Sequence, residues 1–100
     1  MTAIRWTEPA SDDLLGIVEW LADRQPAVAG PVGRRVLAVV ETLRDHPKRG
    51  RSGRSPHTRE LVIPGLPYLV IYSLGPDDPP TVNVLRVLHG AMLWPPFSPR

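Results

Sequence analysis

Apolar and polar positions alternate at the start of the chain and then recur at helical spacing. Residues 2–7 place Ile4 and Trp6 on one side, which predicts a short opening strand. A helical repeat follows, made of Ala10, Leu14, Ile17, Val18 and Leu21. We therefore predict a first helix with Thr7 as its N-cap and Pro9 in its first turn.

A second helical repeat begins after Gln25-Pro26 and ends before His46-Pro47. Its apolar positions are Val28, Val32, Val36, Val39, Val40 and Leu43. Pro31 removes a backbone hydrogen bond from this stretch, so the regular helix is expected to begin near Gly30-Pro31. The short link between the two repeats predicts an antiparallel helical hairpin.

The second half of the chain changes to apolar and β-branched runs, which are typical of strands. These runs cover residues 58–63, 66–74 and 81–88, with turn-forming segments between them. The resulting order, β-α-α-β-β-β, predicts an α+β fold in which the helical hairpin packs on one face of a small, mainly antiparallel sheet. The tail, residues 94–100, has three prolines and is expected to lie extended across the surface.

Length and composition are those of one compact domain. The chain has 100 residues, 42% hydrophobic and 22% charged, so residues 1–100 are expected to form a single domain. No apolar run approaches the roughly 20 residues of a membrane span, and the start lacks a signal-peptide pattern, which predicts a cytoplasmic protein without membrane contact. Cysteine is absent, and Asp12-Asp13 has no accompanying histidine and is better explained as a solvated helix start. We expect neither a metal nor a cofactor.

Charge is segregated along the chain although the net charge is only +2. Residues 8–23 carry five carboxylates and no Lys or Arg, whereas residues 44–60 carry six Lys or Arg side chains and two carboxylates, a net +4. Part of this basic stretch, residues 48–56, has two glycines and no apolar side chain other than a proline, so a mobile loop outside the core is expected. Such a loop attracts polyanions or an acidic partner.

An ordered set of short motifs resembles the RelE/ParE toxin superfamily over nearly the whole chain. The motifs are Ile4-x-Trp6-Thr7, Ala10 with Asp13-Leu14, Pro47 with Gly50-Arg51-x-Gly53-Arg54, Thr58-Arg59-Glu60-Leu61, Pro67-Tyr68-x-Val70-x-Tyr72 and Leu85-Arg86-Val87-Leu88-His89-Gly90-Ala91. The resemblance implies a toxin of a type II toxin–antitoxin pair, held inactive by an antitoxin that we expect to be acidic. It also implies one of two targets: DNA gyrase for ParE-like members, or mRNA on the ribosome for RelE-like members.

The two branches assign different work to the same side chains. In a RelE-like ribonuclease, the resemblance implies Arg59, Arg86 and His89 as catalytic residues, with His89 as the acid/base group because its ordinary pKa lies near neutrality. In a ParE-like toxin, Arg49, Arg51, Arg54 and Arg59 would bind the target or a nucleic acid. The Arg-Val-Leu-His ending and the shortage of loop lysines favour the ParE-like branch slightly. A non-toxic binding module that keeps the fold is the third alternative.

Aromatic side chains are expected to serve mainly in packing. Tyr68 and Tyr72 share one strand face, where packing is favoured over stacking on bases. Trp6 and Trp20 fit the strand and helix patterns and are predicted in the core. Trp94 either pins the tail to the sheet or anchors a partner, and the sequence leaves both open.

Overall fold

The computed structural model of the protein describes residues 2–90. Its elements in chain order are β1 (Ile4–Trp6), α1 (Glu8–Arg24), α2 (Pro26–Glu41), a short 3₁₀ helix η1 (Thr42–Arg44), β2 (Arg51–Ser52), β3 (Arg59–Val62), β4 (Tyr68–Leu74) and β5 (Val82–His89). This order confirms the predicted α+β fold. The two-residue strand β2 is an addition, because it lies inside the segment predicted as a loop.

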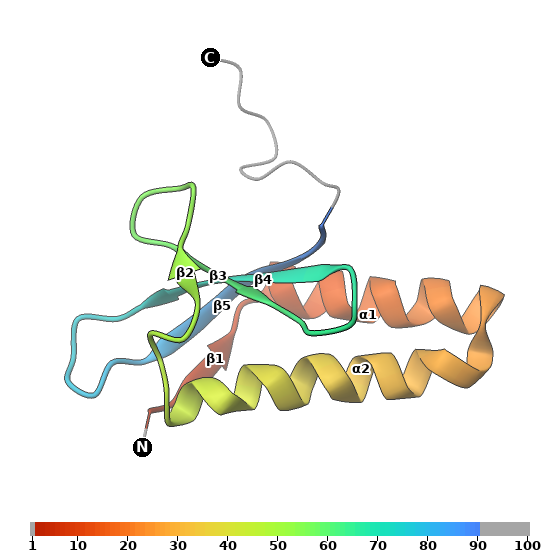
Figure 1. Ribbon diagram of the computed structural model, residues 1–100, viewed down its shortest axis with the longest axis horizontal. Helices are drawn as coiled ribbons and strands as arrows, with labels where there is room; N and C mark the ends of the chain where they lie inside the picture. The colour runs from red at the N-terminus through yellow and green to blue at the C-terminus, as the bar shows by residue number, and fades with distance from the viewer. Residues whose placement is uncertain (1, 91–100) are drawn as a thin grey trace, which may run out of the picture.

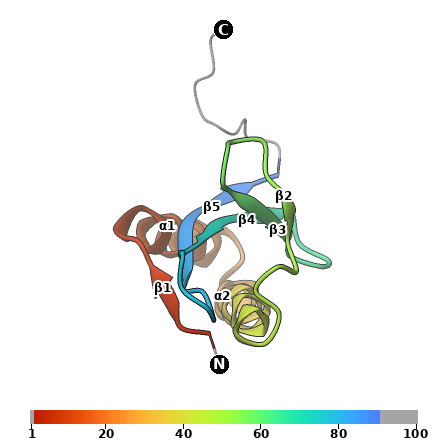
Figure 2. The same ribbon diagram turned by 90° about the vertical axis from the view of Figure 1, so that its left-hand side faces the viewer.

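The five strands form one sheet in the order β1-β5-β4-β3-β2. Strand β1 runs parallel to β5, and the other neighbours are antiparallel, so the sheet is mainly antiparallel as predicted. Both helices cover the same face, and the turn that joins β2 to β3 projects on the other side (Figures 1 and 2). The helical layer and the β2–β3 turn therefore lie on opposite sides of the sheet.

The first helix begins as its sequence predicts. The Thr7 hydroxyl accepts a hydrogen bond from the Ala10 backbone N–H at 3.3 Å, and Pro9 lies in the first turn, where its missing N–H leaves no bond unmade. Thr7 also donates through its hydroxyl to the carbonyl of Val84, at 2.8 Å. The N-cap of α1 is thus attached directly to strand β5.

The second helix contradicts the boundary expected from its proline. It runs without interruption from Pro26 to Glu41, so the prediction that its regular part begins near Gly30-Pro31 is wrong. Pro31 is exposed and removes one backbone bond, while the opposite side of the helix buries Gly33, Val36 and Val40. Burial of that side outweighs the local defect.

The main core lies between the helices and the sheet. Its fully buried members include Val36 and Val40 from α2 and Val70, Tyr72 and Val84 from the sheet. Tyr68 and Tyr72 both belong to this core, which confirms packing as their role. A smaller cluster of Leu69, Ile71 and Leu88 lies on the opposite face of the sheet.

Of the two tryptophans predicted in the core, Trp6 packs against it and Trp20 departs from the prediction. Trp6 is half-buried against the main core, but Trp20 is 53% exposed and lies under the guanidinium of Arg24, 4.2 Å from the ring centroid. Trp20 lines a hollow that α1 forms with residues of β4 and β5, and it is not part of the buried core. Trp94 and the proline-rich tail lie outside the described residues.

No helix within residues 2–90 is long and apolar enough to cross a membrane.

Candidate target-binding surface

The basic segment is fixed to the sheet, which corrects the expectation of a mobile loop. Strand β2 pairs with β3, with Arg51 opposite Glu60 and Ser52 opposite Arg59. Just before β2, the Gly50 N–H donates to the Tyr72 hydroxyl at 2.8 Å, and that hydroxyl donates to the carbonyl of Pro47 at 2.8 Å. The attachment uses polar atoms almost entirely, so the scarcity of apolar side chains in the segment could not predict it.

Tyr72 connects the core to this segment through its hydroxyl. Burial raises the pKa of Tyr72, although the hydrogen bond from Gly50 and the positive charge of Arg59 act in the opposite direction. The hydroxyl therefore keeps its proton and can donate to Pro47 while it accepts from Gly50. A Cβ at position 50 would lie 2.7 Å from the tyrosine ring, so only glycine fits this close approach.

Glu60 is a buried carboxylate that organises two of the arginines. Its residue exposure is 3%, and it accepts from the Arg51 guanidinium at 3.1 Å, from the Arg54 backbone N–H at 3.1 Å and from Arg54 Nε at 3.3 Å. Burial by itself raises the pKa of Glu60, but these hydrogen bonds and the charge of Arg54 outweigh burial and hold the pKa below its ordinary value. The side chain therefore stays ionised near neutral pH and acts as an acceptor.

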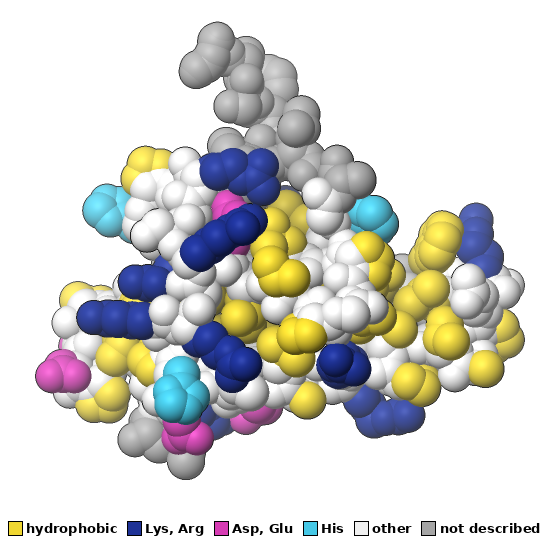
Figure 3. All heavy atoms as spheres, viewed as in Figure 1, with side chains coloured by type: hydrophobic (Ala, Val, Ile, Leu, Met, Phe, Trp, Pro, Cys, Tyr) yellow, Lys and Arg dark blue, Asp and Glu magenta, His cyan; other side chains and the backbone are white. Residues whose placement is uncertain are grey.

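Strands β2 and β3 form an antiparallel β-hairpin, called the hairpin below. The four arginines predicted to bind a target all lie on it or beside it. Arg49 is exposed, and the side chains of Arg51 and Arg54 are 65% and 53% exposed. Arg59 is half-buried and donates to the carbonyls of Gly50 at 2.6 Å and Lys48 at 3.2 Å. We call Lys48, Arg49, Arg51, Arg54 and Arg59 the basic surface; in Figure 3 Lys and Arg side chains gather over the half of the view that carries β2.

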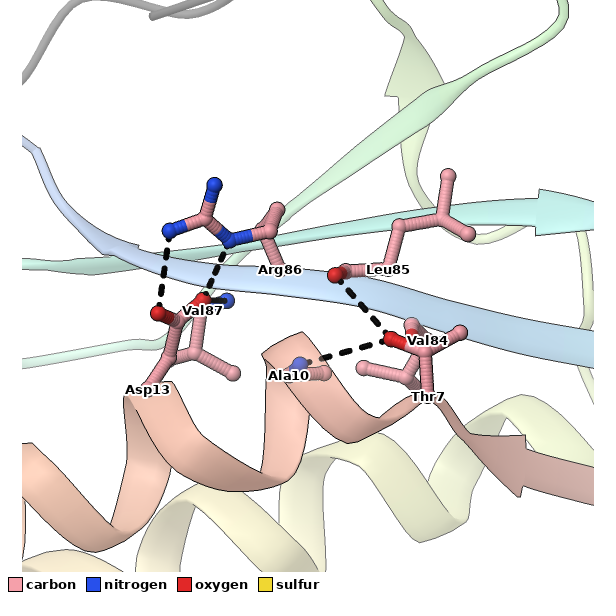
Figure 4. Close-up of polar contacts among 7 residues, drawn as sticks. All are labelled: Thr7, Ala10, Asp13, Val84, Leu85, Arg86 and Val87. Atoms are coloured by element: carbon pink, nitrogen blue, oxygen red, sulfur yellow. Dashed lines mark hydrogen bonds and ion pairs between the residues drawn. The ribbon is translucent and has the colours of Figure 1, made fainter.

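Arg86 lies apart from this surface, in an ion pair with the first helix. Its guanidinium donates to both oxygens of Asp13, at 2.6 and 3.0 Å, and Asp13 also accepts from the Val87 N–H at 3.0 Å (Figure 4). The hydrogen bond to Asp13 raises the pKa of Arg86 against the opposing effect of burial. Asp13 is therefore a link between α1 and β5, and its interpretation as a solvated helix start is wrong.

The partnership of Asp13 has a simple geometric cause. Strand β1 pairs with β5 only as far as Val84, so the edge of β5 beyond that residue needs another partner. The first turns of α1 fill that place, and the Asp13 carboxylate supplies the acceptor that a neighbouring strand would have provided. The sequence motif Asp13-Leu14 thus combines an edge-capping carboxylate with a half-buried leucine that packs against the main core.

The three side chains proposed for RNA cleavage are not brought together. Arg59 is opposite Tyr72 on β4, whereas His89 is opposite Tyr68, four residues away, a separation of about 13 Å along the strand. Arg86 is opposite Ile71, in the cluster on the other face from Tyr68, so Arg86 and His89 start from opposite faces of β5. His89 is exposed and its ring meets Tyr68 edge-on, with ring centroids 5.9 Å apart.

Sequence reasoning missed Glu60 and Asp13 as organising residues. Glu60 did carry a signal, because it stands between Arg59 and Leu61 in an apolar strand, where a carboxylate on a covered face must find cations. Asp13 carried none, because its partners lie 73 and 74 positions away in the sequence. Among residues 2–90, no group of three His, Asp or Glu side chains could hold a metal ion.

The structure has two helices on one face of a mixed sheet and a basic hairpin attached by polar contacts. Comparison of the sequence with known proteins identifies a family. Residues 4–94 match the family described as "ParE toxin of type II toxin-antitoxin system, parDE". The chain is 36% identical over 92 residues to the Y4kP protein of Sinorhizobium fredii, with 92% of each chain covered. It is 35% identical over 83 residues to Toxin RelE1 of Caulobacter vibrioides, covering 81% of this chain and 85% of that toxin.

The chain therefore belongs to the ParE toxin family of the RelE/ParE type II toxins. Solved structures agree in fold. The chromosomal ParDE toxin–antitoxin system from P. aeruginosa superposes with a TM-score of 0.80 at 21% identity, over 89% of this chain and 96% of that one. The toxin–antitoxin complex RelBE2 from Mycobacterium tuberculosis gives a TM-score of 0.59 at 26% identity, over 88% and 90%.

Proposed function

We propose that this toxin inhibits bacterial growth by poisoning DNA gyrase, using the basic surface to engage its target. One observation carries the choice of branch: the side chains that RNA cleavage would need, those of Arg59, Arg86 and His89, lie apart. The Arg86 guanidinium is also hydrogen-bonded to Asp13. Cleavage needs a base, an acid and a phosphate-stabilising cation around one phosphodiester. A toxin that acts by binding needs only an accessible, ordered surface, and the hairpin provides one.

We also propose that an acidic antitoxin neutralises the toxin. Five cations in the basic surface are offset within the hairpin by Glu60, and the partially exposed guanidinium groups suit pairing with carboxylates. The two solved relatives are a toxin–antitoxin system and a toxin–antitoxin complex, which supports a protein partner of this kind. We expect the C-terminal region of the antitoxin to order on binding and to form a stoichiometric complex. Both proteins are expected in the cytoplasm.

The target is tested by inducing the chain in cells without its antitoxin and assaying two lesions in parallel. Gyrase poisoning predicts protein-linked double-strand breaks in plasmid DNA, with intact mRNA on ribosomes. The same preparation should block supercoiling by purified gyrase, and prior addition of the antitoxin should restore it. Cut mRNA on ribosomes with undamaged plasmid would establish the RelE-like ribonuclease instead, and normal growth without either lesion would establish a non-toxic binding module.

A further inference from the structure

An apolar groove lies where α1 passes the start of β4 and the end of β5, and the proposed function does not use it. This α1–β5 groove has a volume of about 410 Å³. Trp20 is 53% exposed there, and an apolar hollow beside an exposed tryptophan is typical of a surface that binds another segment. The residues that form most of the wall are Gly16, Ile17, Trp20, Tyr68, Val87 and Leu88.

The groove has room on its helical side. A Cβ built on Gly16 would meet no other described residue within 4 Å, the helix's own backbone aside. Gly33, in a second hollow between α1 and α2, differs, because a Cβ there would lie 3.1 Å from a methyl group of Val18. Glycine destabilises the interior of a helix relative to alanine, and packing within residues 2–90 does not require it at position 16. The space above Gly16 is therefore available to a side chain of another segment.

The polar groups of the groove disfavour an acidic ligand. Asp13 is already bound to Arg86 and to the Val87 N–H. Asp12 also lines the groove and is exposed, so it places a carboxylate at the entrance. A segment rich in carboxylates, as expected of the antitoxin, would meet like charge here. An apolar segment without acidic residues suits the groove better.

The chain itself continues from the edge of this groove. Thr7 is bonded to Val84 and Asp13 to Val87, so α1 and β5 run in the same direction along their junction (Figure 4). Strand β5 ends at His89, which lines the groove. The N–H of the next residue, Gly90, donates to the Pro67 carbonyl at 2.6 Å. The described part of the chain therefore ends one residue beyond the groove wall.

Residues 91–100, which lie outside the described residues, have a composition that complements the groove. They contain no Asp or Glu and a single Arg, and their large apolar side chains are Met92, Leu93, Trp94 and Phe97. Four extended residues beyond Gly90 reach about 13 Å, and α1 borders the groove for about 12 Å. Because the segment is tethered beside the groove, its effective concentration there is on the order of millimolar, so even a weak contact is populated.

We propose that the α1–β5 groove is the docking site of the chain's own residues 92–94, with apolar side chains seated over Gly16 and against Trp20. Of the two roles open to Trp94, this assigns the one within the molecule: Trp94 holds the tail against the fold. The proposal does not depend on the target of the toxin, so its failure would leave the proposed function standing.

A spin label on the full chain gives the direct test. The sequence has no cysteine, so Ser98→Cys provides a single attachment site for a nitroxide. In two-dimensional NMR spectra of the purified toxin, the label should broaden the amide signals of Gly16 and Ile17 and the indole signal of Trp20. The matched control carries the same label together with Trp94→Ser, and the broadening should be lost. Equal broadening with and without Trp94→Ser would overturn the proposal.

Filling the groove from the helical side tests the same contact without altering the segment that docks. Gly16→Leu places a side chain in the open space and improves the helix propensity, so the variant should fold and the labelled chain should lose its broadening at Ile17 and Trp20. Gly16→Ala is the matched control, because one methyl group leaves most of the groove open and the broadening should remain. Unchanged broadening in folded Gly16→Leu would contradict docking in this groove. If Gly16→Leu does not fold, the comparison with Trp94→Ser decides alone.

Other ligands of the groove give different results. Groove signals that change on dilution of the unlabelled toxin would assign the groove to a second copy of the chain. Groove signals that ignore Trp94→Ser but shift when the antitoxin is added would assign it to the antitoxin. Either result would overturn the proposal, whereas shifts caused by Trp94→Ser and independent of toxin concentration would support it.

Discussion

Single polar residues attach the basic hairpin to the sheet. Glu60 accepts three hydrogen bonds from Arg51 and Arg54, and the Tyr72 hydroxyl connects Gly50 to Pro47. These contacts replace the apolar side chains that the segment lacks. A buried carboxylate that loses its partners is costly, so the arginines that point toward solvent also stabilise the fold.

Glu60 should make stability depend on pH in the acidic range. Its pKa in the folded state lies below the ordinary value of 4.5, so ionised Glu60 stabilises the fold above that pH, and this contribution is lost as pH falls through the folded-state pKa. Urea unfolding from about pH 6 to about pH 3 should therefore show a steeper fall for the wild type than for Glu60→Gln. At neutral pH the variant should be less stable by about 1–3 kcal/mol.

The control for this pH experiment is Glu19→Gln, which removes an exposed carboxylate from α1. Its curve should follow the wild type at every pH, because the exchange leaves the buried contacts of Glu60 unchanged. A Glu60→Gln curve parallel to the wild-type curve would mean that another carboxylate governs acid stability.

Elements are joined by contacts that span the chain. Asp13 on α1 binds both Arg86 and the Val87 N–H of β5, and the Thr7 cap binds Val84 of the same strand. Helix α1 thereby takes over the edge of β5 where β1 ends. The sheet and the helical layer are thus joined by hydrogen bonds as well as by the apolar core.

Replacing Asp13 with Asn tests this junction. Asparagine keeps an acceptor for the Val87 N–H but loses the ion pair with Arg86, so unfolding should become easier by about 1–3 kcal/mol. A double-mutant cycle with Arg86→Gln, measured by urea unfolding, should give a coupling of at least about 0.5 kcal/mol. Strictly additive effects would show that the ion pair contributes little beyond its separate parts.

Helix α2 offers a stabilising substitution. Pro31→Ala restores a backbone donor inside a continuous helix without removing buried contacts, and should raise the free energy of unfolding by about 1–3 kcal/mol. Pro26→Ala is the matched control, because proline at the first helical position is well tolerated and its loss should leave stability nearly unchanged. Thermal unfolding of both variants compares them, and an unchanged or lower melting temperature for Pro31→Ala would contradict the expectation.

The sequence predicted those helices and strands whose apolar side chains recur at a regular spacing, because these side chains pack in the core. The spacing of Ala10 to Leu21 and the apolar runs after residue 58 reflect sides that face the same interior, and Thr7 marks the helix start through local chemistry. The continuity of α2 across Pro31 was not predictable, because burial of Val36 and Val40 overrides a local preference. Strand β2 and the roles of Asp13 and Glu60 depend on partners brought together only by folding.

At the scale of the whole molecule, the basic surface and the Arg86 ion pair lie on different strands. The proposal assigns target binding to the basic surface, whereas the ion pair links α1 to β5. The side chains of Arg51 and Arg54 remain more than half exposed, whereas the Arg86 side chain is 30% exposed and is paired with Asp13. This division suits a protein that acts by presenting a charged, ordered surface to a target.

His89→Gln distinguishes the two branches of the family at this scale. Glutamine keeps some hydrogen bonding but cannot titrate near neutral pH, so a ribonuclease that uses His89 as acid or base should lose roughly a hundredfold in rate. A toxin that acts through the basic surface should remain toxic on induction, with undiminished gyrase-linked breaks, whereas Arg59→Ala should weaken it. His89 is exposed at the end of β5, so the exchange should leave folding intact. If toxicity and ribosome-bound mRNA cleavage disappear together in a folded variant that still binds its antitoxin, the target is mRNA and the gyrase proposal is wrong.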